Sequence, residues 1–388
     1  MTEPVGRAVT LATIAGEWSR IGITGFGGPP AHIALLRTLC VEQRGWLTPE
    51  QFEDGVAATN LLPGPASTQL AIFCAWRLRG RAGALIGGVC FIVPGLVCIL
   101  ALSALFFSST APAWVRGAAA GAGAAVPAVA LAAALGLAPS SWKRAANTRP
   151  GRVRWTAYLL ASLVAAATVG PYLVLVLLAC GVVEVLAQKP WAERRPLAVI
   201  PVFGAQTVAL AGFGALAWVA FKVGALSYGG GFVIIPLMQH DVVTTYHWMT
   251  NAQFLNAVAL GQITPGPVVQ TVAAVGYAAG GIGGGLLAAL VAFAPSFAFV
   301  LVGAPHFERL RRNARMQAFL TGAGAAAIGA IAGASLPLGL ALSHLWQLGV
   351  LGLAVAWLIG LRRGVVAALL GSGALGVVAA LAGAPVGH

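Results

Sequence analysis

Long apolar stretches, separated by short polar or basic segments, follow one another along most of the chain. They lie at residues 82–108, 116–137, 155–170, 172–187, 198–220, 283–304, 316–342, 346–360 and 364–383. A helix of about 20 apolar residues crosses the hydrocarbon core of a bilayer, and the shorter stretches suit packed or tilted helices. The pattern therefore predicts an all-α membrane protein that crosses the bilayer many times.

The composition supports this prediction and excludes a soluble globular fold. Of the 388 residues, 59% are hydrophobic and 9% are charged, and the mean hydropathy is +0.88. A soluble domain carries about 25% charged residues, and a single soluble core stops growing near roughly 250–300 residues. The abundant glycines and alanines suit transmembrane helices that approach one another closely.

The net charge of +13 would suggest a nucleic-acid partner in a soluble protein. Here the arginines and lysines lie in short loops, which is the distribution that the positive-inside rule predicts. Aromatic side chains do not interleave with the basic ones, as a base-stacking surface would require. We therefore expect a lipid bilayer, and no nucleic acid, as a partner.

The sequence offers no motif for catalysis or for a bound cofactor. It contains no metal-ligand spacing, Walker loop, dinucleotide fingerprint or nucleophile elbow, and its five cysteines are scattered without a CxxC pair. We predict no cofactor, no metal and no enzymatic activity, and we interpret the cysteines as small buried apolar residues. No cleavable signal peptide stands out in the first residues.

The chain contains an internal repeat at an offset of 202 residues. The turn 63-PGP-65 recurs as 265-PGP-267, and 46-WLTPEQF-52 recurs as 248-WMTNAQF-254. Further matches join Gly22, Gly27 and Gly28 to Gly224, Gly229 and Gly230, Phe26 to Tyr228 and, after a slip of one residue, Pro94 to Pro295. So many matches at one offset identify two homologous halves, which we place at 1–196 and 197–388.

Loop charges predict that the two halves have opposite topology. Basic residues follow the motifs of the first half, at Arg37, Arg44, Arg77, Arg79 and Arg81, whereas the corresponding segments 239–250 and 277–285 contain none. If the remaining basic connectors at 143–154, 189–195, 309–315 and 362–363 are cytoplasmic, helix 82–108 runs outward and helix 283–304 runs inward. Segment 198–220 then provides the additional crossing. Inverted repeats with broken helices are typical of secondary transporters, whose site lies near the midplane.

This topology requires that residues 8–38 and 51–79 each begin and end on the same side of the membrane. Each contains a helix breaker in its middle, 25-GFGGPP-30 in the first and 63-PGP-65 in the second. We therefore predict two re-entrant, hairpin-like helix pairs. Full crossings by both segments leave the loops on similar sides, so that alternative stays open.

The breakers point to an anion site. A half-helix that begins at the second proline of a PGP turn presents free amide groups, near residues 66–68 and 268–270, and helix starts attract anions. Irregular backbone inside a bilayer is tolerated where it lines a cavity. The candidate binding residues are Gly27, Gly28, Pro63, Gly64, Pro65, Ser67, Thr68 and Gln69 in the first half, and Tyr228, Gly229, Gly230, Pro265, Gly266, Pro267, Gln270 and Thr271 in the second. Proline kinks and glycines that serve only helix packing are the alternative.

Three further side chains extend this hypothesis. Arg20 and Lys222 align at the repeat offset. No acidic residue in its own half is placed to pair with Lys222, since the nearest in sequence, Asp241, lies nineteen positions away at a predicted membrane edge. The missing counter-ion leaves room for an anionic substrate. Because a lysine inside a bilayer usually faces a cavity or a partner, we predict that both bases help to bind the substrate. A snorkelling lysine and an ion pair of Arg20 with Glu17 are alternatives. His32 could donate to an anion or carry a proton, or serve packing.

The motifs 26-FGGPPAH-32, 44-RGWLTPEQF-52 and 62-LPGPASTQ-69, with 227-SYGGGFVIIPL-237, 247-HWMTNAQFL-255 and 261-GQITPGPVVQT-271, resemble those of the chromate ion transporter family. The chain is similar to long-chain members with two fused halves, over most of its length. The resemblance implies a multi-pass protein of the bacterial inner membrane that exports chromate and confers chromate resistance, with sulfate as a chemical look-alike. Departures at 227–228 and 74–75 bear on fine specificity.

The sequence thus predicts a secondary transporter that binds a divalent tetrahedral oxyanion between the two half-helix starts. An interior-negative membrane potential drives anions outward, which fits export. A transporter or channel for another small anion or for a neutral solute is the alternative. The coupling ion and the formation of a homodimer stay open.

Overall fold

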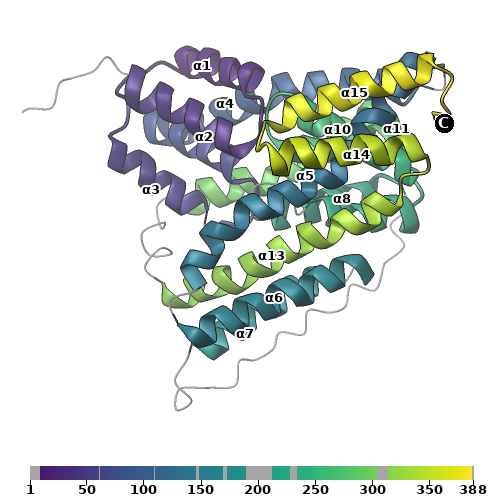
Figure 1. The fold of residues 1–388 in the computed structure, drawn as a ribbon. Coiled ribbons are helices and arrows are strands. Elements are labelled where there is room, and N and C mark those ends of the chain that lie inside the picture. The colour runs from purple at the N-terminus through teal and green to yellow at the C-terminus, as the bar shows by residue number, and fades with distance from the viewer. Residues whose placement is uncertain are drawn as a thin grey trace, which may run out of the picture.

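The computed structural model describes residues 9–60, 62–108, 110–145, 148–168, 173–188, 212–227, 234–303 and 313–386, and within these ranges all regular structure is helical (Figure 1). The predicted all-α architecture is confirmed. The predicted boundary between residues 196 and 197, most of the predicted crossing 198–220, and the candidates Tyr228, Gly229 and Gly230 lie outside the described residues.

The described elements of the two halves follow one another in matching order, with two additional short elements, η5 and η7, in the second half. The first half has α1 (Leu11–Thr24), α2 (Pro29–Arg37), the π-helical turn η1 (Thr38–Gln43), α3 (Pro49–Thr59), α4 (Ala66–Phe106), α5 (Ala113–Ala145), α6 (Arg149–Thr168) and α7 (Leu173–Ala187). The second half has α8 (Phe213–Leu226), α9 (Ile234–Gln239), η4 (His240–Thr245), α10 (Asn251–Ile263), the 3-10 turn η5 (Val268–Gln270), α11 (Thr271–Gly303), α13 (Ala314–Leu340), α14 (Leu345–Val355), η7 (Ala356–Gly360) and α15 (Val365–Leu381).

The sequence repeat recurs in local structural detail. Thr48 caps α3 and Thr250 caps α10, each in a capping box that is completed by a glutamine three residues later. Gly22 of α1 and its match in α8, Gly224, also have equivalent neighbours. A Cβ on Gly22 would meet the carbonyl oxygen of Phe91, and a Cβ on Gly224 would collide with the carbonyl oxygen of Ala292. The two halves therefore share caps and close backbone contacts as well as motifs.

The two segments predicted to be hairpin-like fold back on themselves in the first half. Glu17 on α1 forms an ion pair with Arg44 after η1, and a Cβ on Gly55 of α3 would touch the ring of Phe73 on α4. Helix α1 has 14 residues and α3 has 11. At 1.5 Å per residue they span roughly 16–21 Å, less than the hydrocarbon core of about 30 Å. These lengths favour re-entrant hairpins over full crossings.

Helices α4 and α11 also turn back sharply, at equivalent positions. The backbone leaves helical geometry at Arg79 and Gly80 in α4, and at Gly280 and Gly281 in α11. The second residue of each pair has a positive φ, 58° and 63°, which glycine adopts without the penalty of a side chain. We call residues 66–79 and 81–106 the first and second limbs of α4, and residues 271–280 and 282–303 the first and second limbs of α11.

The second limbs of α4 and α11 cross in antiparallel directions. Gly88 of α4 faces the ring of Phe297 on α11, and further along, the side chain of Leu100 on α4 faces Gly285. Equivalent helices that run antiparallel through a common crossing are what an inverted repeat requires, because its pseudo-two-fold axis lies in the membrane plane. The predicted inverted architecture with broken helices is therefore present in the fold.

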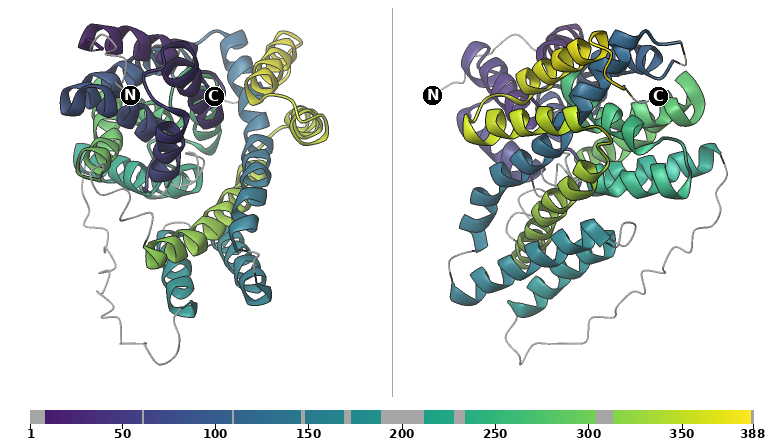
Figure 2. Two further views of the ribbon diagram at one scale, coloured as in Figure 1. Left: turned by 90° about the vertical axis from the view of Figure 1, so that its left-hand side faces the viewer. Right: turned by 45° about the vertical axis from the view of Figure 1, so that its right-hand side comes forward.

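The halves also exchange their last helices. Helices α6 and α7 pack on α13 of the second half, whereas α14 and α15 pack on α5 of the first (Figures 1 and 2). Glycines allow these approaches: a Cβ on Gly329 would collide with the carbonyl oxygen of Leu159, and one on Gly121 with that of Ser372. Small residues at such contacts let transmembrane helices approach closely.

Apolar side chains cover much of the outer surface. In the second limb of α4, Leu85, Val89, Val93 and Val97 follow one another at helical spacing and are exposed. By length and composition, four of the described helices, Ala66–Phe106, Ala113–Ala145, Val268–Gly303 and Ala314–Leu340, could cross a membrane. An exposed apolar belt around such helices is the surface that lipid covers, and the chain is a multi-pass membrane protein.

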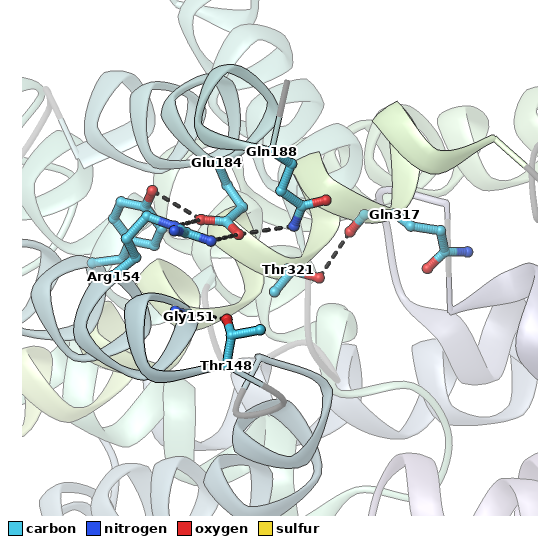
Figure 3. A network of polar contacts seen from close by, with 8 residues as sticks. Thr148, Gly151, Arg154, Glu184, Gln188, Gln317 and Thr321 are labelled. Atoms are coloured by element: carbon cyan, nitrogen blue, oxygen red, sulfur yellow. Dashed lines mark hydrogen bonds and ion pairs between the residues drawn. The ribbon is translucent and has the colours of Figure 1, made fainter. Parts of the chain in front are cut away.

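One buried polar network joins α6 to α7 (Figure 3). Glu184, 4% exposed, accepts hydrogen bonds from Arg154 Nε at 2.7 Å and Nη2 at 3.0 Å. It also accepts from Tyr158 Oη at 3.1 Å and from Gln188 Nε2 at 2.9 Å. Four donors satisfy the buried carboxylate, so the network stabilises the α6–α7 pair beside α13.

Candidate functional site

Each PGP turn starts a new helix in the interior of the protein. Gly64 and Gly266 have φ angles of 117° and 93°, which only glycine adopts without strain. Helix α4 then begins at Ala66 without a side-chain cap, whereas the second turn leads into the 3-10 turn η5 before α11 begins. The sequence correctly predicted a break and a restart in both halves.

Both turns lie against the opposite half. The amide of Gly266 donates a hydrogen bond of 3.0 Å to the carbonyl oxygen of Gly25 in the first half. The carbonyl of Pro265 lies beside Gly95 in the second limb of α4, and reciprocally Gly64 lies beside Ser296 in the second limb of α11. The fold therefore gathers both PGP turns and the first GFGG turn around the crossing of the two second limbs, which we call the central crossing.

Each glutamine of this region donates a side-chain hydrogen bond to a backbone carbonyl of the protein. Gln69 Nε2 donates to the carbonyl oxygen of Pro63 at 2.7 Å, and Gln270 Nε2 donates to that of Ile92 at 2.7 Å. Thr271 Oγ1 donates to Val268 O at 2.8 Å, and the amide of Gln270 to Pro267 O at 2.9 Å. Carbonyls left open by the broken helices thus recruit the nearest amide or hydroxyl, and the role of Gln69, Gln270 and Thr271 in substrate binding stays a prediction.

Several buried polar atoms on α2, α4, η5 and α11, and one directly after α8, have no hydrogen-bond partner in the described part of the chain. They are His32 Nδ1, Thr68 Oγ1, Gln69 Oε1, Ser227 Oγ, Gln270 Oε1 and Ser296 Oγ. A buried polar atom without a partner costs about 1–3 kcal/mol, so proteins seldom retain several together unless a ligand, water or ion completes them. Three of these atoms are hydroxyl groups that can donate to an anion.

His32 lies at the base of the first GFGG turn. It is fully buried, its ring meets Phe91 edge-on, and its Nε2 lies 2.9 Å from the carbonyl oxygen of Gly25. Because a carbonyl can only accept, Nε2 carries the hydrogen. The Gly25 carbonyl thus accepts from both His32 and Gly266, which ties the histidine to the second PGP turn.

Gly27 and Gly28 shape this turn rather than offer side chains to it. Their φ angles are 101° and 73°, and α2 begins directly afterwards at Pro29. A Cβ on Gly28 would lie 3.5 Å from Val268 of the second half. This is an ordinary contact distance, so the positive φ angles, rather than crowding, favour glycine at these two positions.

The prediction that Lys222 lacks a protein partner was wrong. Its ammonium forms an ion pair with Asp241 and lies 5.7 Å from the centre of the Trp218 ring. Asp241 is distant in sequence, but η4 lies back against α8 and brings the carboxylate to the lysine. A role of Lys222 in substrate binding stays a prediction, without the argument from a missing counter-ion.

Arg20 lies on the surface, with a side chain that is 64% exposed. It forms the ion pair with Glu17 that the sequence left open as an alternative, with 3.5 Å between Nη1 and Oε2. Glu17 also binds Arg44, so α1 and the end of its hairpin share one acidic residue. The structure thus places Arg20 away from the buried atoms of the central crossing.

Sequence reasoning missed Gly25, Gly95 and Ser296 as neighbours of the PGP turns. The match of Pro94 with Pro295 had marked the second limbs as part of the repeat. The residues directly after those prolines, Gly95 and Ser296, are the ones that face the opposite PGP turns. A signal was therefore present, but only the antiparallel crossing reveals what it means.

Comparison with known proteins adds independent information. The family model for chromate transporters matches residues 12–185 and 214–377, that is, two successive regions of the chain. No solved structure matches the chain.

Among curated proteins, the chain is 33% identical to a chromate transport protein of Cupriavidus metallidurans over 338 residues, which cover 84% of this chain and 82% of that one. It is 29% identical to a probable chromate transport protein of Synechococcus elongatus, with 91% of both chains covered. A chromate transport protein of Pseudomonas aeruginosa is 30% identical, over 87% of this chain and 83% of the relative.

Proposed function

This chain belongs to the chromate transporter family, and we propose on that premise that it is a secondary transporter that exports chromate from the cytoplasm. The observation that carries the proposal is the central crossing. Two broken helices from inverted halves meet there, and buried hydroxyl and histidine atoms around them lack partners within the described chain. Such atoms suit a small polar solute that passes through the middle of a membrane protein.

The proposed binding groups are backbone amides and hydroxyls. The amides at residues 66–68 open the uncapped start of α4, and the hydroxyl of Thr68 is buried beside them. A tetrahedral dianion accepts hydrogen bonds in several directions, and a helix start supplies oriented donors together with about half a positive charge. Gln69 and Gln270 hold the turns in position rather than donate to the ion.

Binding without a buried cation at the crossing suits transport. Lys222 is neutralised by Asp241, and Arg20 is exposed. An anion held by amides and hydroxyls, rather than by a full positive charge, can also leave the site, which transport requires. The proposed site is therefore one of modest affinity.

The energetics of the membrane potential support export as the direction of transport. An interior-negative membrane potential contributes roughly 2.3 kcal/mol per charge per 100 mV, and about twice that for a dianion. We propose that the two inverted halves provide inward-open and outward-open states of similar structure, so that the ion is released outside by alternating access. In a bacterial inner membrane this activity lowers cytoplasmic chromate and confers resistance.

The proposal is tested by transport into everted membrane vesicles, in which the cytoplasmic face is outside. Vesicles that contain the protein are expected to accumulate labelled chromate faster than vesicles without it, and sulfate in excess is expected to compete. An imposed potential, positive inside the vesicle, is expected to speed uptake. The proposal fails if chromate uptake equals that of the control vesicles while antibody detection shows the protein in the membrane.

A further inference from the structure

A cavity of about 500 Å³ leads away from the first PGP turn. It lies between the start of α2, the segment 59–66 and the last third of α5. Gly64 is among its lining residues, and Arg144 near the end of α5 lines it as well. The cavity therefore joins an element of the central crossing to the end of α5.

Arg144 is the one charged side chain among the described residues that line this cavity. The two hydroxyl groups of the lining form hydrogen bonds within their own helices: Thr59 Oγ1 donates to Gly55 O at 2.9 Å, and Ser140 Oγ donates to Leu137 O at 3.0 Å. Arg144 itself is exposed. An otherwise neutral cavity with one exposed cation in its lining is electrostatically suited to an anion.

The packing of the helices indicates on which side the cavity opens. Glycines 329 and 333 of α13 face Leu159 and Leu163 of α6, so these two helices run parallel and both start at the same side. The basic connector 143–154 therefore lies on the same side as Asn313 and Arg315 at the start of α13. The positive-inside rule places this side in the cytoplasm.

A second, smaller cavity of about 260 Å³ lies at the opposite end of α5, where Arg116, Ser108, Gln253 and Gln347 are among the lining residues. Between the residues of α5 that line the two cavities, every residue from 124 to 130 is buried. A buried stretch of α5 thus separates the lining of the inner cavity from that of the outer one along the helix. Each cavity has one arginine of the same helix in its lining.

We infer that the inner cavity is the cytoplasmic vestibule through which the oxyanion reaches the central crossing, and that Arg144 collects the anion at its mouth. The inference rests on the proposed function, since it names the entry route to that site. Arg144 compensates for the lack of a buried cation at the crossing: it raises the local concentration of anions without holding them inside the membrane. It acts as a specificity residue for anions over neutral solutes.

The test compares Arg144→Gln with Lys143→Gln in everted vesicles. Lys143 is the adjacent basic residue, is also exposed, and is not among the residues that line the cavity. Arg144→Gln is expected to raise the KM for chromate by about fivefold or more with kcat nearly unchanged, because it removes an attraction that acts equally on the bound ion and on the ion during translocation. Lys143→Gln is expected to change KM by less than about twofold, and Arg144→Lys to retain most of the affinity. Equal KM values for Arg144→Gln and Lys143→Gln overturn the inference.

A second measurement separates this inference from the proposed function. A Cβ on Gly136 meets nothing within 4 Å and Gly136 lines the cavity, so Gly136→Cys introduces a thiol there without a clash. An anionic thiosulfonate reagent is expected to label this cysteine faster than a cationic reagent of similar size, and Arg144→Gln is expected to abolish the preference. The five native cysteines set the background, which the parent chain measures. No anion preference overturns the vestibule even where chromate is transported, and a preference without chromate transport overturns the substrate instead.

Discussion

The backbone amide of Gly266 donates a hydrogen bond to the carbonyl oxygen of Gly25, with 3.0 Å between the two atoms. This bond joins the second PGP turn to the first GFGG turn, which lies in the other half of the chain. His32 donates to the same carbonyl at 2.9 Å. The carbonyl group of Gly25 therefore connects the two halves between the GFGG break of the first half and the PGP break of the second.

Gly266→Ala tests this connection. Gly266 has a φ of 93°, and a Cβ there would also lie 3.2 Å from Gln270 Nε2. A side chain in the left-handed region costs roughly 1–2 kcal/mol, and relief of this strain would move the turn away from Gly25. We expect transport to fall by about tenfold or more, which corresponds to about 1.4 kcal/mol, measured as initial chromate uptake per amount of folded protein.

Gly45→Ala is the matched control. Gly45 also has a positive φ, 59°, but a Cβ there meets nothing within 4 Å. Both variants thus carry comparable backbone strain, and only Gly266→Ala disturbs the central crossing. If both variants lose transport equally, the loss reflects general destabilisation and the connection between Gly25 and Gly266 has no special role.

Thr68→Val removes one of the buried hydroxyls without changing the volume. Thr68 is fully buried and its Oγ1 has no partner in the described chain. Since an unsatisfied hydroxyl costs about 1–3 kcal/mol, a purely structural residue would gain stability when it is replaced by valine. We expect thermal stability to be equal or higher, and the KM for chromate to rise by about tenfold, as expected for a lost hydrogen bond to a charged ligand.

Ser103→Ala provides the comparison for this prediction. Ser103 is another buried hydroxyl on α4 without a partner in the described part of the chain, but it lies near the end of the second limb. Its replacement by alanine is expected to leave the KM unchanged. Unaltered KM values in both variants would remove Thr68 from the proposed site.

Sequence alone predicted the helical class, the repeat, its inversion and the two kinds of breaker. These features depend on patterns that recur along the chain: apolar stretches, matched prolines and glycines, and the charge of loops. The hairpin at 8–38 was also foreseeable, because its breaker and its basic end are close in sequence.

What the sequence could not reveal are the contacts that form only after the chain folds back. Lys222 meets Asp241 because η4 returns to α8, and Gln270 meets Ile92 because the two second limbs cross. No periodic pattern in the sequence predicts either of these two contacts. For the same reason the sequence could not show that Gln69 and Gln270 each donate to an open carbonyl of the protein.

The ion pair of Lys222 with Asp241 gives a prediction that separates structure from substrate binding. Lys222 is 21% and Asp241 9% exposed in their side chains, so removal of the lysine leaves a largely buried carboxylate without its cation. Breaking such a pair costs up to about 3–5 kcal/mol. We expect Lys222→Ala to lower both the melting temperature and the amount of protein in the membrane.

The exchanged variant, Lys222→Asp with Asp241→Lys, is the decisive measurement. It restores opposite charges across the same contact, so stability and chromate transport are both expected to recover to within about twofold. If stability recovers and transport does not, the ammonium at position 222 acts on the anion itself, as the sequence first suggested.

Glu184→Gln is expected to weaken the α6–α7 pair without impairing transport. The substitution keeps the shape of the side chain but removes the charge that Arg154, Tyr158 and Gln188 all address (Figure 3). Because Arg154 is 28% exposed and so retains some hydration, we expect the free energy of unfolding to fall by about 2–3 kcal/mol, below the full cost of breaking a buried pair. This loss would appear as a melting temperature several degrees lower.

Glu42→Gln, which breaks an exposed pair with Arg37, is the control and is expected to cost less than about 1 kcal/mol. Uptake per folded protein should match the parent in both variants, because neither network touches the central crossing; a loss of uptake at unchanged stability in Glu184→Gln would instead make this buried carboxylate part of the transport cycle.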